Sequence, residues 1–205
     1  MIYDEMAGFE NLYQAHLQAG RGKRGQREVI EFELDLAWNL QKVRGELMSG
    51  RYCPKPYKQF KIYAPRERVI HALQYRDRIV QHSLCDNILT PYMERHLFYD
   101  NAASRKGKGT HFAMDRLTLF LHRFYRKYGT DGYFLKFDIR KYYDSIDHNI
   151  LKKLLEKAFI EDKRLLRLIN IYIDSYPVSG RRGFRWEIRQ ASCLLYIIWM
   201  DWTGL

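Results

Sequence analysis

Apolar residues recur at steps of three and four in several stretches of the chain, which is the spacing of one face of an α-helix. In the first long stretch these residues are Val29, Phe32, Leu36, Leu40, Val43 and Leu47. The spacing predicts one packed helix that ends at Ser49-Gly50. Residues 76–90 continue the pattern, and we expect that helix to end at Pro91, because proline cannot maintain the hydrogen bonds of a helix interior.

Two further helices are predicted in the second half of the chain. Residues 111–128 place apolar side chains on one face, namely Ala113, Leu117, Phe120, Leu121 and Phe124. A later helix can be capped by Ser145 or Asp147, whose side-chain oxygens accept hydrogen bonds from the first backbone N–H groups. The apolar residues that this helix should bury are Ile150, Leu151, Leu154, Leu155 and Phe159.

Strand-like alternation occurs in two places. Phe60 and Ile62 alternate with polar neighbours just before residues 64–67, which predicts a basic β-hairpin with its turn there. Residues 133–138, YFLKFD, follow a glycine-containing turn and predict a strand that ends at Asp138. The chain should therefore have an α+β fold that is rich in helix.

Composition narrows the class of partner. The 205 residues are 46% hydrophobic, and 35 basic against 24 acidic residues give a net charge of +11, which favours binding to nucleic acid. A membrane surface is a poorer match, because no basic segment has a strongly apolar opposite face. Three cysteines without ligand spacing and the absence of a signal peptide or a long apolar run predict a cytoplasmic protein with no membrane partner.

Asp138 is the first candidate for chemistry, because a carboxylate at the end of a rigid strand is a good ligand for Mg²⁺. The alternative is that Asp138 only caps a turn, as many aspartates after strands do. His82 and Cys85 lie on one predicted helix without further ligands nearby, so we expect them to be core residues rather than a metal site.

The segment FDIRKYYDSIDH, residues 137–148, resembles the first catalytic motif of bacterial reverse transcriptases. The resemblance implies that Asp138 and the main-chain oxygen of Ile139 bind Mg²⁺, with Mn²⁺ as an alternative. It also implies that Tyr143 lies beneath the sugar of the incoming deoxynucleoside triphosphate, where a bulky ring would exclude a ribose 2′-hydroxyl. Core packing is the alternative role for Tyr143.

Two upstream segments extend the resemblance over about residues 50–175. PRERVIHALQYRDRIVQHSLCDNI is similar to the family's fingers motif, which implies that Arg66 and Arg68 hold the triphosphate. SRKGKGTH is similar to the next motif and implies that Arg105, Lys106 and Lys108 contact nucleic acid. The implied partners are an RNA template, a DNA or RNA primer, deoxynucleoside triphosphates and an accessory protein of a retroelement or defence system.

Phosphoryl transfer with two metal ions about 4 Å apart needs more than one carboxylate. Reverse transcriptases supply others from a Tyr-x-Asp-Asp hairpin, and this chain contains no such tetrad. Back-translating residues 183–205 with permitted codons and reading two bases later gives LPLGNQTSQLFALYYLDGLDRL, which resembles a motif of the family in its diversity-generating retroelement form. The subgroup of the parent enzyme is not fixed by this motif, and group II intron, retron-type and phage-defence reverse transcriptases are the alternatives.

We therefore expect a small insertion or deletion between about Tyr176 and Gly183, and little or no polymerase activity in the chain as translated. The alternative is that residues 181–205 are a genuine, divergent C-terminal segment. A non-catalytic RNA-binding fragment and an unstable pseudogene product are the rival functions.

The implied fold is the fingers and partial palm of a right-hand polymerase. Its expected divisions are an N-terminal helical extension, residues 1–50, a fingers-like region with the basic hairpin, 51–130, a partial palm, 131–180, and an out-of-frame tail, 181–205.

Overall fold

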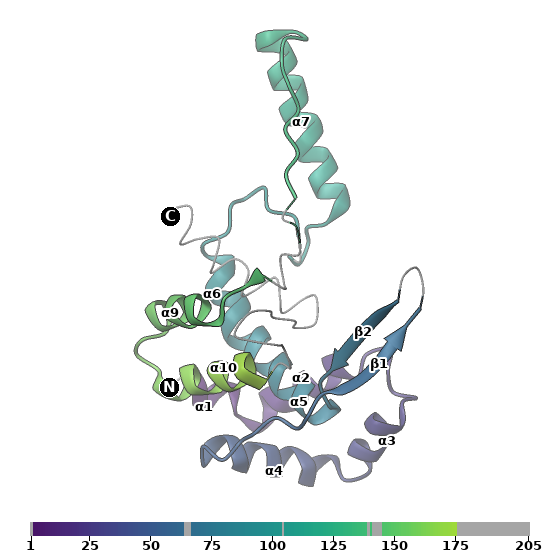
Figure 1. The fold of residues 1–205 in the computed structure, drawn as a ribbon, viewed down its shortest axis with the longest axis vertical. Coiled ribbons are helices and arrows are strands. Elements are labelled where there is room, and N and C mark those ends of the chain that lie inside the picture. Colours follow the sequence, from purple (N-terminus) through teal and green to yellow (C-terminus); the bar gives the residue numbers. More distant parts are fainter. Residues whose placement is uncertain (1, 64–66, 104, 139, 141–144, 176–205) are drawn as a thin grey trace.

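The computed structural model describes residues 2–63, 67–103, 105–138, 140 and 145–175 (Figure 1). It is a helix-rich α+β structure in which the described strands form one antiparallel hairpin. In chain order its elements are α1 (Ile2–Met6), α2 (Phe9–Ala19), α3 (Arg27–Leu34), α4 (Leu36–Met48), β1 (Lys58–Ile62), β2 (Arg68–Ala72), α5 (Tyr75–Leu84), the π-helical turn η1 (Cys85–Leu89), α6 (Thr90–Glu94), α7 (Thr110–Tyr128), α9 (His148–Ala158) and α10 (Lys163–Ser175).

The hydrophobic core combines helices from both ends of the described chain. α2 packs against α5, and α9 packs against α10. Leu12 on α2, Leu40 on α4, Ile79 and Leu84 on α5, and Tyr172 on α10 are fully buried in one cluster. Burying such side chains removes apolar surface from water, which is the main favourable contribution to folding.

The first predicted helix is divided in two, so the expectation of one continuous helix was wrong. Asp35 has a non-helical backbone (φ −126°, ψ 49°) and separates α3 from α4. The side-chain amide of Asn39 donates a hydrogen bond of 3.0 Å to the carbonyl of Phe32, which compensates for part of the interrupted backbone ladder. The break lets Val29 on α3 and Leu40 on α4 both reach the core.

The helix that begins at Tyr75 does not end at Pro91 as the sequence predicted. After α5 the hydrogen bonding changes to the wider π pattern, and the N–H of Thr90 donates to the carbonyl of Cys85. Pro91 then lies in the first turn of α6, where its missing N–H costs little. A local change of helix type thus accommodates the proline without a break.

The predicted hairpin is confirmed. Lys58 pairs with Ala72 and Ile62 with Arg68, in an antiparallel register. We call the helices that share the hydrophobic core, α1–α6, α9 and α10, the body. Every residue of β1 is exposed, and the hairpin projects from the body rather than covering it (Figure 1).

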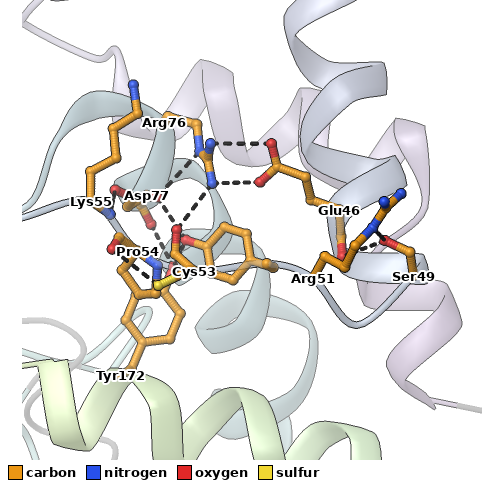
Figure 2. A network of polar contacts seen from close by, with 10 residues as sticks. Glu46, Ser49, Arg51, Cys53, Pro54, Lys55, Arg76, Asp77 and Tyr172 are labelled. Carbon is orange, nitrogen blue, oxygen red and sulfur yellow. Dashed lines mark hydrogen bonds and ion pairs between the residues drawn. The ribbon is translucent and has the colours of Figure 1, made fainter.

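A buried polar network joins the base of this hairpin to α5 and α10 (Figure 2). The carboxylate of Asp77, fully buried on α5, accepts hydrogen bonds from the Tyr52 hydroxyl and the Lys55 N–H, both at 2.9 Å. The Tyr172 hydroxyl donates to the Asp77 carbonyl at 2.9 Å and lies 2.6 Å from the Tyr52 hydroxyl. Arg76 lies 3.4 Å from the Asp77 carboxylate, so the buried charge has a partner.

The helix α7 is confirmed, but its apolar face is not packed. None of its 19 residues is buried. In Figure 1 it extends away from the other helices, and the chain after it returns alongside it. We call α7 together with residues 129–138 the arm. Gly129 allows the reversal with a φ of 63°, and a side chain at Gly132 would overlap the ring of Phe124.

The strand predicted for residues 133–138 was wrong. This segment has no regular secondary structure, and Phe134 is 78% exposed. A strand needs a neighbour to satisfy its backbone groups, and β1 and β2, the strands among the described residues, pair with each other. Between the returning segment and α7 lies an open groove of about 810 Å³, lined largely by apolar side chains of α7.

The helix α9 confirms one of the two proposed caps. Asp147 accepts hydrogen bonds from the N–H groups of Asn149, at 2.8 Å, and Ile150, at 3.3 Å. Leu151, Leu154 and Leu155 are buried as predicted and Phe159 packs partly against the core, whereas Ile150 is exposed. Ile150 lies in the first turn of the helix and faces outward, so the prediction that it is buried was wrong.

Candidate nucleic-acid interface

A basic loop, residues 97–103 and 105–109, connects α6 to α7 and contains the cations that the sequence singled out. Hydrogen bonds fold it on itself: the Asn101 N–H donates to the carbonyl of Phe98 at 3.1 Å, and the Lys108 N–H to that of Arg105 at 3.2 Å. Gly107 has a φ of 73°, a conformation that favours glycine. The loop is therefore irregular but internally bonded.

Two of the predicted nucleic-acid contacts also hold the loop together. The Arg105 guanidinium donates to the carbonyl of Phe98 at 3.0 Å. The Lys108 ammonium donates to the carbonyl of Tyr99 and lies 4.0 Å from the centre of that ring. Lys106 is exposed. The three cations thus share a small region, and Lys106 is the most accessible of them to a phosphate.

An aromatic group lies beneath these cations. Tyr99 packs edge-on against Phe112 with ring centres 5.7 Å apart, and the Lys108 ammonium lies 4.5 Å from the Phe112 ring centre. The Arg116 guanidinium lies over Tyr99 at 5.2 Å and forms an ion pair with Asp100. Cations over ring faces are attracted by the negative face of the π system, so this arrangement fixes the rings.

The local charges affect one another. Desolvation and then the neighbouring positive charge of Arg105 lower the pKa of the Lys108 ammonium. The hydrogen bond from Arg116 lowers the pKa of the Asp100 carboxyl. Neighbouring cations thus contribute to both shifts, in a loop where one carboxylate faces several cations. An incoming polyanion would relieve this repulsion.

Two lysines of the hairpin are paired with carboxylates. Lys58 forms an ion pair with Glu28 at 2.8 Å, and Lys61 with Glu67 at 2.7 Å. Arg66 lies outside the described residues, and Arg68 is placed in β2 by its backbone, while its side chain is outside the description. The predicted triphosphate contact through Arg66 and Arg68 stays a prediction.

Of the residues predicted to bind the metal, Asp138 lies within the described part of the chain. Asp138 is exposed at the end of the irregular segment of the arm, and Ile139 and Tyr143 lie outside the described residues. Within the described part of the chain, no three His, Cys, Asp or Glu side chains gather in a metal-binding group. The Mg²⁺ or Mn²⁺ site therefore stays a prediction, with Asp138 as the one carboxylate that the described residues offer to it.

Sequence reasoning missed Tyr99, Phe112 and Arg116 as part of this interface. A signal was present, because Phe112 and Arg116 are four residues apart at the start of α7 and must share a face. Their meeting with Tyr99 depends on the path of the basic loop, which spacing alone does not reveal.

Comparison with known proteins gives limited information. No protein-family model matches the chain. It is similar to Protein YkfC of Escherichia coli (strain K12), with 28% identity over 138 residues, which are 65% of this chain and 35% of YkfC. The chain thus spans about a third of the length of this curated relative. Among the described helices, none has the length and apolar content needed to cross a membrane.

Proposed function

We propose that the chain is the fingers and first palm segment of a bacterial reverse transcriptase, that it binds RNA through the basic loop, and that it does not synthesise DNA as translated. The motif resemblance over residues 50–175 supports the parentage. The observation that carries the binding activity is the gathering of cations in one short region: Lys108 and Arg116 lie over Tyr99, and Arg105 and the exposed Lys106 belong to the same loop.

Phosphate contacts supply most of the affinity of such a surface. Cations that neutralise phosphates release condensed counterions, so binding weakens as salt rises. Lys106 is exposed, and the Arg105 guanidinium and the Lys108 ammonium each donate a hydrogen bond to a carbonyl oxygen. A backbone of phosphates therefore finds several cations within one short loop, with the exposed ring of Tyr99 beside them.

The proposed lack of synthesis rests on the missing carboxylates. The sequence has no Tyr-x-Asp-Asp, and the described residues bring no group of metal ligands to Asp138. In the proposed parent enzyme this motif follows in another reading frame. The residues that would carry the nucleotide in that parent are Arg66, Arg68 and Tyr143.

Fluorescence anisotropy with a labelled single-stranded RNA tests the binding. We expect the logarithm of the binding constant to fall linearly with the logarithm of salt concentration, and Lys106→Gln to reduce the slope by about 0.7. Lys42→Gln removes the same charge from an exposed position on α4, away from the basic loop, and should change neither slope nor affinity (Figure 1). Equal effects of the two variants would refute the assignment of the basic loop.

Primer extension with Mg²⁺ or Mn²⁺ tests the proposed lack of synthesis. We expect no extension by the chain. Extension that disappears in Asp138→Ala would show that the chain is a polymerase after all. Failure to bind RNA together with the absence of a cooperative unfolding transition would favour the unstable product instead.

A further inference from the structure

We propose that Tyr99 is a stacking platform for an unpaired base, so that the basic loop binds single-stranded nucleic acid in preference to a duplex. This inference rests on the proposed function and adds the class of ligand. It comes from the contrast between the exposure of the ring and the number of groups that hold it.

The Tyr99 ring is fixed and still accessible. Lys108, Arg116 and Phe112 contact it at centre distances of 4.0, 5.2 and 5.7 Å. Its own carbonyl accepts a hydrogen bond from the Lys108 ammonium, which holds the backbone as well. Even so, 65% of the residue is exposed. A large ring held in place but left open to solvent loses little conformational freedom when it binds a flat partner.

The neighbouring cations make a base the best-matched partner. A base that stacks on Tyr99 places its own phosphates close to the ring, where Lys106 is exposed and Arg105 and Lys108 are fixed. Single-stranded nucleic acid is bound in this way by aromatic platforms within a basic groove, and the stacking tolerates any base because each has a π face.

Stacking, rather than charge, would discriminate between strands. In a duplex the faces of the bases are covered by their neighbours, so a protein ring cannot reach them without unstacking a pair. Phosphates are present in both forms, and the cations therefore contribute to both. Removing the ring should reduce binding to single strands alone, whereas removing a cation should reduce both.

The test compares a labelled oligouridine of about ten nucleotides, a typical site length for such platforms, with a fully paired, blunt-ended RNA duplex. Tyr99→Leu should weaken oligouridine binding on the order of tenfold and duplex binding less than twofold, with an unchanged salt slope. Tyr99→Phe keeps the ring and should bind like the original chain. Tyr133→Leu makes the same change at an exposed tyrosine of the arm and should have no effect.

The outcomes separate this inference from the proposed function. If the original chain binds neither RNA, the proposed function is wrong. If it binds both equally, or if Tyr99→Leu weakens both equally or neither, the platform is refuted while the RNA-binding loop stands. Should Tyr99→Leu unfold, measured by circular dichroism, the comparison rests on Tyr99→Phe and Tyr99→Trp, and a loss of single-strand preference in both refutes the platform.

Discussion

Two helices of this chain show the same kind of pattern and have opposite surroundings. In α5 nearly every residue is buried, including Asp77, Arg78 and Gln81. In α7, whose apolar positions are spaced at least as regularly, no residue is buried. An amphipathic pattern therefore indicates that a helix has a face to cover, but not whether a neighbour covers it.

The reason for the difference lies in what each helix meets. α5 packs against α2 and is joined to α10 through Asp77 and Tyr172 (Figure 2). Over α7 the described chain brings the basic loop, which contacts Phe112 and Arg116, and the short return after Gly129, which leaves an open groove from Leu117 onward. Stability should therefore be concentrated in the body, and the arm should contribute little to it.

The largest effect should come from the buried network of the body. Asp77→Ala removes the acceptor of the Tyr52 hydroxyl and the Lys55 N–H, whereas Arg76 keeps its ion pair with Glu46 at 2.7 Å. We expect a loss of about 2–5 kcal/mol in the free energy of unfolding, measured by urea denaturation, because two donors lose their buried acceptor. Asp131→Ala in the arm, where the residue is exposed, is the matched control. A loss under about 1 kcal/mol for Asp77→Ala would contradict the role of the network.

A pair of identical substitutions compares the two regions directly. Leu40 is fully buried and Leu121 is 40% exposed on α7. Leu40→Ala should cost about 2–5 kcal/mol, because it removes apolar contact and leaves a cavity, whereas Leu121→Ala should cost less than about 1 kcal/mol. The measurement is again urea denaturation. Equal losses would mean that the arm is as well packed as the body.

The smallest effect should be a dependence of body stability on pH. His16 lies on α2 and is buried. Desolvation lowers the pKa of its imidazole below 6.5 and outweighs the opposing effect of Glu33. The unfolded chain therefore takes up a proton first as pH falls. Stability should decrease from pH 7.5 downward through the ordinary pKa until the folded state is protonated as well.

Thermal unfolding at pH 7.5 and pH 5.5 measures this effect. The melting temperature should fall more in the original chain than in His16→Gln, which cannot be protonated. An equal fall in both proteins would assign the pH dependence to other groups.

Features of the fold that depend on local hydrogen bonds could be predicted from the sequence. The hairpin pairs neighbouring segments, and Asp147 caps a helix that begins with the next residue. The strand ending at Asp138 could not be predicted in this way, because its partner would have to come from elsewhere in the fold. The wider hydrogen bonding before Pro91 is likewise invisible in a pattern of apolar positions.

The candidate site could be predicted in part. The resemblance of SRKGKGTH to a motif of reverse transcriptases implied Arg105, Lys106 and Lys108 as nucleic-acid contacts. That Arg105 and Lys108 also bond to loop carbonyls, and that Tyr99 lies beneath Lys108 and Arg116, follows from the path of the chain between α6 and α7.

The central claim is that this chain is the first part of a reverse transcriptase whose remaining catalytic motif lies in another frame. The nucleotide sequence downstream of the codon for Gly180 tests it most directly. We predict a shifted frame that encodes GNQTSQ and, beyond it, Tyr-x-Asp-Asp. If neither motif occurs in any frame of that sequence, the claim is wrong.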